Sequence, residues 1–304
     1  MIEITYSPPV AQAKASGVPL VALESTIITH GMPFPQNVQT ARAVEAEVRA
    51  GGAVPATIAV LAGRLHVGLT DGELDTLGRA KHVAKLSRAD FAACLATGGT
   101  GATTVAATMI AAHLAGIETF ATGGIGGVHR GAETSFDISA DLAELAQTPV
   151  TVVAAGAKAI LDIAKTLEVL ETAGVPVIVY RQDAFPAFWS RSSGLPAPLR
   201  LDSADDIAAS ARMRAALGLP GGQLVANPIP QADEIPAEDL APVIAAALAA
   251  AEQAGIAAKS VTPFLLDHIF HATEGRSLTA NIALVKNNAR LAARIAAAFA
   301  AMPA

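Results

Sequence analysis

The stretch VTVVAAGAKAILDIAKTLEVLETAGVPVIVY, residues 150–180, decides the fold class. It begins with the apolar run 150–154 and ends with the apolar run 176–180, and both have the length of a buried strand. The segment between them favours a helix from about residue 157. Strands that alternate with helices are typical of an α/β protein with a largely parallel sheet.

The same alternation continues on both sides of this stretch. The sequence predicts an α/β fold with a largely parallel or mixed central sheet, helices on both faces (α/β/α layers) and a helical C-terminal third, all in one domain, 1–304. Residues 183–201 are the one long irregular segment, and a loop of this length favours a lid or an interface. Further strands are predicted at 18–23, 57–61, 64–67, 119–121 and 223–226. Further helices are predicted at 36–50, 87–95, 102–115, 139–146, 204–217, 240–254, 263–272 and 278–300.

Composition excludes several classes of protein. The 304 residues are 52% hydrophobic and 16% charged, against a usual charged share of about 25%, which excludes a disordered chain and indicates surface hidden in an oligomer. The net charge of −6 argues against a general nucleic-acid binder. The longest apolar run, 240–251, is too short to span a bilayer, and we expect no membrane association. A single cysteine, Cys94, and no secretory signal at the N-terminus predict a cytoplasmic protein.

Two ionisable residues follow apolar strands. Glu24 ends the run Val-Ala-Leu, where partial burial of a carboxylate favours acid–base use, although Glu24-Ser25-Thr26 could instead cap a helix. Lys158 follows the run 152–157 at the start of the expected helix. An amine there can act as a nucleophile and form a Schiff base with a carbonyl. The alternative is a solvated lysine on the first helical turn.

Glycine-rich and acidic segments complete the candidate site. The segments 98–101 and 123–127 could approach a phosphate, but neither fits a P-loop or a complete dinucleotide-binding motif. Ser139 is a candidate N-cap whose helix start could bind an anion. Asp137 could hold a hard divalent cation, or Asp137 and Asp141 could simply stabilise a helix N-terminus. For His268 and His271, three apart on an expected helix, a structural role is favoured over zinc.

Taken together, these segments resemble the pseudouridine-5′-phosphate glycosidase family, also called the indigoidine-synthase-A-like family. The resemblance runs from about residue 18 to the last helix. The stretches that carry it are VALESTIITHGMPFPQN (21–37), GATTVA (101–106), FATGGIGGVHRGAE (120–133), FDISADL (136–142), AGAK (155–158), VANPIP (225–230) and TPFLL (262–266).

The resemblance implies the reversible cleavage of pseudouridine 5′-phosphate to uracil and ribose 5-phosphate. It implies that Lys158 is the nucleophile that forms a Schiff base with C1′, and that Glu24 is the proton donor. It further implies a divalent metal, manganese, at Asp137, and a homotrimer. The residues that would bind the substrate are Lys85, Val105, Ser139, Ala140 and Asp141 for the sugar phosphate, with His129 and Asn281 close to the reacting groups and Asn281 a candidate for reading the uracil edge.

Two other functions share these features. One is a Schiff-base aldolase that acts on another sugar phosphate, with the same lysine and the same loops. The other is a sugar-phosphate-binding protein without catalysis. Release of uracil from pseudouridine 5′-phosphate separates the family's activity from both.

Overall fold

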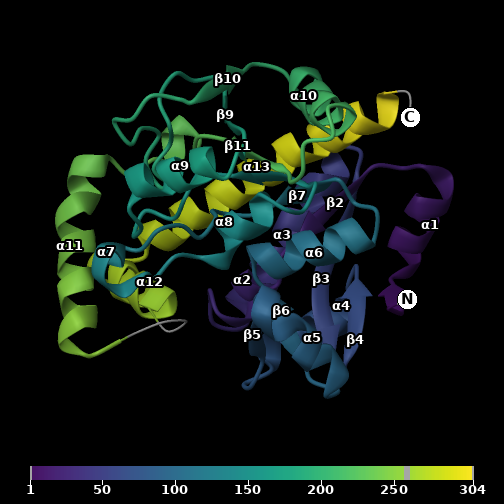
Figure 1. Cartoon of the computed structure of the whole chain (residues 1–304). Coiled ribbons are helices and arrows are strands. Elements are labelled where there is room, and N and C mark those ends of the chain that lie inside the picture. Colours follow the sequence, from purple (N-terminus) through teal and green to yellow (C-terminus); the bar gives the residue numbers. More distant parts are fainter. Residues whose placement is uncertain (1, 257–260, 303–304) are drawn as a thin grey trace.

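Parallel strands form the centre of the molecule (Figure 1). The structure is a computed structural model that describes residues 2–256 and 261–302. In this part of the chain, eleven strands join in one sheet with the path β1-β4-β3-β2-β7-β8-β11-β9-β10, while β6 pairs with β3 and β5 pairs with β6. The strands are β1 (Ile4–Tyr6), β2 (Leu20–Leu23), β3 (Val54–Leu61), β4 (Arg64–Val67), β5 (Ala84–Leu86), β6 (Gly101–Thr103), β7 (Thr119–Ala121), β8 (Thr151–Ala154), β9 (Val177–Tyr180), β10 (Leu199–Leu201) and β11 (Gln223–Ala226).

From β3 to β10 along this path, all neighbouring strands are parallel. Antiparallel pairing occurs where β3 meets β4 and β6. In the register, Leu23 of β2 lies opposite Ala121 of β7, which lies opposite Val153 of β8. The residues that follow these three strands therefore share one edge of the sheet, where ligands bind in open α/β folds.

Helices cover the sheet. The helix α13 contacts α3, α10, β2, β7 and β8, whereas α6 contacts α8, α5, β2, β3 and β7. Every residue of β8, β9 and β11 is buried, as expected for parallel strands that are covered on both faces. The helices are α1 (Pro8–Ser16), α2 (Thr26–Thr29), α3 (Gln36–Ala50), α4 (Asp71–Arg79), α5 (Arg88–Ala96), α6 (Val105–Leu114), α7 (Ala132–Ser135), α8 (Ala140–Leu145), α9 (Ile163–Thr172), α10 (Ala204–Ala216), α11 (Ala237–Gln253), α12 (Val261–Ala272) and α13 (Arg276–Ala301), with the 3-10 turn η1 (Gln231–Asp233).

This architecture confirms the predicted α/β fold with a helical C-terminal region. Figure 1 shows α13, in yellow, running across much of the molecule beside the central strands. The helix 36–50 and the strand 223–226 have the predicted bounds, and the hairpin of β3 and β4 turns at Ala62 and Gly63 as expected. The predicted start of α5 is also confirmed, because the Asp90 carboxylate accepts a hydrogen bond from Ser87 N at 3.1 Å.

Two predicted helices begin later than expected. Residues 102 and 103, predicted as the start of the helix 102–115, belong to β6 instead, because β6 pairs with β3 and β5, and α6 begins at Val105. The helix expected from about residue 157 begins at Ile163, where the Asp162 side chain accepts a hydrogen bond from Lys165 N at 3.0 Å. Lys158 therefore lies in the loop between β8 and α9, and the argument that placed it at a helix start is wrong.

The irregular segment 183–201 lies against the core. Its aromatic residues Phe185, Phe188 and Trp189 are buried. The Phe188 amide donates a hydrogen bond to Ala155 O at 3.1 Å, which fixes the segment to the loop that carries Lys158. Its last residues form β10, which pairs with β9.

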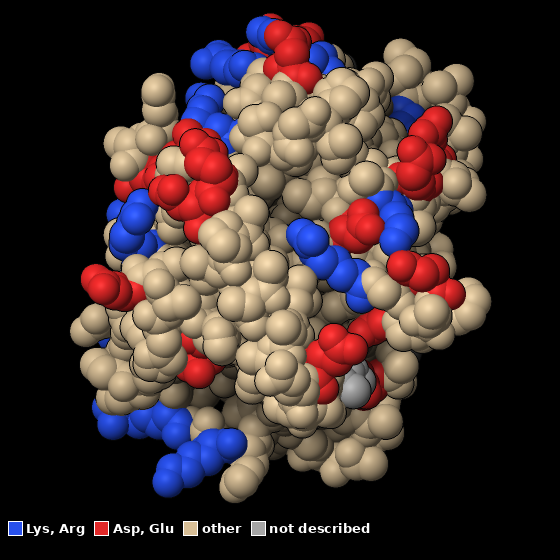
Figure 2. All heavy atoms as spheres, turned by 90° about the vertical axis from the view of Figure 1, so that its left-hand side faces the viewer, with Lys and Arg blue, Asp and Glu red and all other residues tan. Residues whose placement is uncertain are grey.

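The low share of charged residues is visible on the surface of the molecule. Figure 2 shows acidic and basic side chains interspersed on one face, with wide uncharged areas between them. Among the described residues, no helix combines the length and the apolar character that a bilayer crossing requires. Cys94 is buried, and burial raises the pKa of its thiol.

Candidate active site

A cavity of about 340 Å³ opens at the edge of the sheet where β2, β7 and β8 end. This volume is in the range of a small-molecule site. The glycine-rich segment 98–101, considered for phosphate binding, does not line the cavity. The cavity does bring together every residue that the resemblance assigns to the site, although these residues come from seven separate parts of the chain. They are Glu24, Lys85, Val105, His129, Asp137, Ser139, Ala140, Asp141, Lys158 and Asn281.

Glu24 directly follows β2 and lines the cavity. One of its carboxylate oxygens accepts a hydrogen bond from the Thr26 hydroxyl, and the other accepts one from the Thr122 hydroxyl. The alternative interpretation, a helix cap, holds by position only, because Ser25 is the N-cap residue of the short helix α2. The Ser25 hydroxyl makes no capping bond and instead donates to Ile58 O at 2.6 Å. The carboxylate is thus held by two hydroxyl groups at the wall of the cavity.

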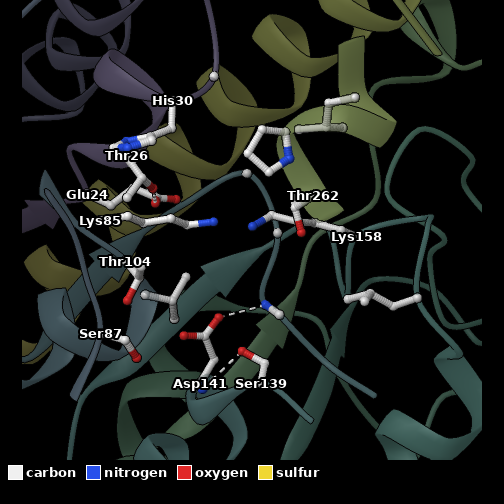
Figure 3. A pocket seen from close by; sticks show the side chains of 18 of the residues that line it. Glu24, Thr26, His30, Lys85, Ser87, Thr104, Ser139, Asp141, Lys158 and Thr262 are labelled. Carbon is white, nitrogen blue, oxygen red and sulfur yellow. Dashed lines mark hydrogen bonds between the residues drawn. The ribbon is translucent and has the colours of Figure 1, made fainter. Parts of the chain in front are cut away.

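Lys158 enters the cavity from the loop after β8. Its amide donates to Ile125 O at 3.1 Å, which fixes the loop to the glycine-rich segment after β7. In Figure 3 the amino groups of Lys158 and Lys85 point toward one another across the cavity. The side chain is partly buried, so this lysine is not one that extends freely into solvent.

Two histidines line the same cavity. Burial lowers the pKa of His129, and the positive charges of Lys158 and Lys85 lower it further, against the opposing effect of Asp137. Burial and the positive charge of Lys85 likewise lower the pKa of His30, against the opposing effect of a hydrogen bond with the backbone of Val83. Both imidazoles are therefore biased toward the neutral form.

The start of α8 and the start of α6 meet at one end of the cavity. Ser139 is the N-cap of α8, as predicted, and its hydroxyl accepts a hydrogen bond from Asp141 N at 3.2 Å. The Asp141 carboxylate is occupied by backbone hydrogen bonds. It accepts one from Ala106 N at 2.9 Å and one from Gly126 N at 2.8 Å. Val105, Ser139 and Ala140 remain at the cavity wall, where backbone amides can bind an anion.

The environment of Asp137 offers few metal ligands. Its carboxylate lies 3.9 Å from His129 Nδ1. Within residues 2–256 and 261–302, no group of three or more His, Cys, Asp and Glu side chains is placed to hold a metal. His268 stacks on Phe264, and His271 is an exposed side chain 3.7 Å from Asp267.

Several residues of the cavity were not predicted as functional. Thr26 and His30 lie in the stretch 21–37, and Thr262 begins the stretch 262–266. Thr122, in the stretch 120–133, does not line this cavity but donates a hydrogen bond to Glu24. These stretches carry the resemblance to the family, so the sequence did single them out. No local pattern in them showed which side chains would face a ligand. Other unpredicted residues of the cavity include Ser87, Thr104 and Phe188.

A family model described as indigoidine synthase A like protein matches residues 9–298. The chain belongs to the indigoidine synthase A-like family. The chain is also similar to proteins named pseudouridine-5′-phosphate glycosidase. One from Jannaschia sp. (strain CCS1) is 71% identical over 297 residues, covering 98% of both chains. One from Roseobacter denitrificans is 70% identical over 300 residues, covering 99% of this chain and 97% of the relative.

Two solved structures share the fold. The prealnumycin C-glycosynthase AlnA, in complex with ribulose 5-phosphate, superposes with a TM-score of 0.91 at 41% identity over 98% of this chain and 97% of that chain. An indigoidine synthase A-like protein from Thermotoga maritima superposes with a TM-score of 0.88 at 32% identity over 97% and 96%.

Proposed function

We propose that this chain is a pseudouridine-5′-phosphate glycosidase, which reversibly cleaves pseudouridine 5′-phosphate to uracil and ribose 5-phosphate. Two relatives with this name are 71% and 70% identical over nearly the whole chain. The observation that carries the proposal is that an amine and a carboxyl group, Lys158 and Glu24, line one cavity from strands that flank β7. AlnA, a C-glycosynthase that binds a pentulose phosphate, supports the same class of ligand.

The substrate explains why a lysine is needed. Ordinary glycosidases use two carboxyl groups, one of which protonates the departing oxygen. In pseudouridine the bond to be broken joins C1′ to C5 of uracil, and a carbon leaving group has no lone pair to protonate. An amine at C1′ can instead supply the electrons that break this bond.

The reaction then proceeds in three steps. The neutral Lys158 amine forms a bond to C1′ while the bond from C1′ to the ring oxygen breaks, and a proton passes from the new ammonium nitrogen to that oxygen, so the nitrogen regains its lone pair. Glu24 donates a proton to C5, the bond between C1′ and C5 breaks, and the nitrogen lone pair forms the C=N bond of a protonated Schiff base. Water hydrolyses the Schiff base, which releases ribose 5-phosphate and frees the amine.

The end of the cavity where α6 and α8 begin is suited to the phosphate. We assign Lys85, the backbone at Val105 and the segment 139–141 to sugar-phosphate binding, since an ammonium group and helix-start amides are common phosphate ligands. This remote contact would hold C1′ against Lys158. His129 and Asn281 are assigned to the reacting groups, with Asn281 reading the uracil edge.

A divalent cation, manganese by resemblance, is assigned to Asp137. A carboxylate oxygen and water are suitable ligands for Mn²⁺, and the neutral form of His129 offers a nitrogen nearby. With so few protein ligands, the bound cation would keep most of its coordinated water molecules. When bound, it would supply positive charge near the sugar phosphate.

The assembly and location are part of the same proposal. A homotrimer agrees with the low charged share of 16%, and Phe136, 82% exposed next to Asp137, is an apolar side chain that a partner subunit could cover. The single buried cysteine agrees with the cytoplasm. Light scattering tests the trimer, and a monomeric mass would refute it.

The decisive experiment is incubation of the purified protein with pseudouridine 5′-phosphate and measurement of free uracil. We expect uracil from the parent and none from Lys158→Ala. Lys165→Ala is the matched control, because this lysine pairs with Glu133 and Asp162 on the outside of the same segment. Binding without uracil release would favour the non-catalytic function, and cleavage of a different sugar phosphate would favour the aldolase.

A further inference from the structure

Asn288 is a fully buried polar residue on the apolar face of α13. Its relative exposure is 0%, and the same face carries the buried residues Leu284 and Leu291. A buried amide without partners would destabilise the fold. Asn288 lies seven residues after Asn281, so both asparagines lie on the same side of the helix.

All the polar atoms of this side chain have partners. The amide nitrogen of Asn288 donates to Thr122 O at 2.8 Å and, at a longer 3.4 Å, to Gly123 O. Its oxygen accepts a hydrogen bond from Asn227 Nδ2 at 3.0 Å. Asn227 belongs to the stretch 225–230, to which the proposed function assigns no role. The three residues Asn227, Asn288 and Thr122 thus join the end of β11, α13 and the end of β7.

This network continues to Glu24. Thr122 is 1% exposed, and its hydroxyl donates to a carboxylate oxygen of Glu24. Its main chain is held by Asn288 on one side and, through its amide, by Val153 O at 3.0 Å on the other. The position of the Glu24 carboxyl group therefore depends on a residue that Asn288 holds in place.

The loop that carries Lys158 depends less on Asn288. Gly123 O also accepts a hydrogen bond from Ala155 N at 2.8 Å, shorter than its contact with Asn288. Lys158 N has its own bond to Ile125 O. Loss of the Asn288 amide should therefore disturb Glu24 more than Lys158.

We propose that Asn288 is a positioning residue that orients Glu24 through Thr122. This inference rests on the proposed function, in which Glu24 protonates C5 of uracil. Asn288 then controls cleavage of the bond between C1′ and C5. It does not control the reaction of ribose 5-phosphate with Lys158, which needs no proton at C5.

The experiment compares these two reactions in Asn288→Leu. We expect kcat for uracil release to fall by roughly ten- to a hundredfold, with KM for pseudouridine 5′-phosphate changed by less than about threefold. Borohydride trapping of ribose 5-phosphate on Lys158 should keep the parent yield. Thr122→Val should give the same pattern, and the double variant should lose little more than either single variant, because the two residues act in series.

Asn287→Ala is the matched control on the same helix turn. It removes a comparable asparagine–carbonyl bond, to Pro228 O at 3.1 Å, away from Thr122, and we expect the parent rate. If Asn288→Leu does not fold, Asn288→Ser, which keeps a small polar group but cannot reach both partners, replaces it.

Two outcomes overturn this inference and leave the proposed function intact. One is a folded Asn288 variant that releases uracil at the parent rate. The other is a variant that loses borohydride trapping and uracil release to the same extent. A parent that releases no uracil overturns the proposed function, and the inference falls with it.

Discussion

The Asp141 carboxylate accepts a hydrogen bond from the amide of Gly126 at 2.8 Å. Its second oxygen accepts one from Ala106 N at 2.9 Å, so a single buried side chain joins the glycine-rich loop after β7 to the first turns of α6 and α8. Two amide donors compensate its charge. The acidic residue Asp141 is therefore compatible with a phosphate-binding end of the cavity, because its carboxylate holds the backbone at Ala106 and Gly126 in place around the ligand.

Gly126→Ala should disrupt this arrangement. A Cβ atom at this position would lie 2.6 Å from Ser139 Cβ and 2.8 Å from the Asp141 carboxylate, so α8 would have to shift. We expect KM for pseudouridine 5′-phosphate to rise about tenfold or more, as for the loss of one charge-assisted contact. Gly72→Ala is the control, since no atom lies within 4 Å of its added Cβ. Equal KM values for the two variants would contradict the role of this loop.

Lys85→Met should weaken binding more than chemistry. Methionine keeps the apolar stem and removes the ammonium group that reaches into the cavity. The loss of a charged contact to phosphate predicts a rise in KM of roughly ten- to a hundredfold, with a smaller change in kcat. Steady-state kinetics of uracil release measure both, with Lys81→Met, at an exposed position nearby, as the control. A fall in kcat at unchanged KM would show that Lys85 acts on the reacting bond instead.

Local signals explain which elements the sequence could predict. The helix 36–50 is bounded by Pro35 and Gly51, and α5 by the pair of Ser87 and Asp90, so both have signals within a few residues. The strand β6 was missed because its pairing with β3 comes from residues far away in the sequence. The helix α4 was also missed, although Thr70 and Glu73 form a capping box at its start.

The candidate site was predictable in part for a different reason. Glu24 and Lys158 follow apolar strands, and parallel strands bring their carboxyl ends to one edge. The sequence could not predict that Thr122 and Asn288 support Glu24, because these contacts join residues 98 and 166 positions apart. It also placed Lys158 on a helix, since the alanine-rich run before Asp162 has high helix propensity and its true conformation is set by contacts with Ile125 and Phe188.

Stability should fall when the pH drops below about 6.5, in part because of His30. Its pKa is lowered in the folded protein, chiefly by burial, so the unfolded chain binds the proton more readily. Protonation below the unfolded pKa therefore favours unfolding, and the effect grows as the pH falls. His30→Gln should lose fewer degrees of Tm than the parent between pH 7 and pH 5, as measured by calorimetry. Equal losses in both proteins would refute this assignment.

Removal of metal should test Asp137. If a divalent cation is held there, a chelator should lower uracil release by the parent, and manganese should restore it. Asp137→Asn keeps the size of the side chain but removes the charge that the cation needs, so its residual activity should respond to neither treatment. Full activity of the parent in a metal-free preparation would remove Asp137 from this role.

Borohydride treatment in the presence of ribose 5-phosphate tests the covalent step directly. Reduction of a Schiff base leaves a stable secondary amine, so the mass of the reduced adduct should appear on the peptide that contains Lys158. Glu24→Gln should form the adduct at nearly the parent yield while releasing almost no uracil, because the proton at C5 is required only for the break between C1′ and C5. Lys158→Ala should give no adduct, and Lys165→Ala should give the parent yield. An adduct on Lys85 instead, whose amino group faces Lys158 across the cavity, would reassign the nucleophile (Figure 3).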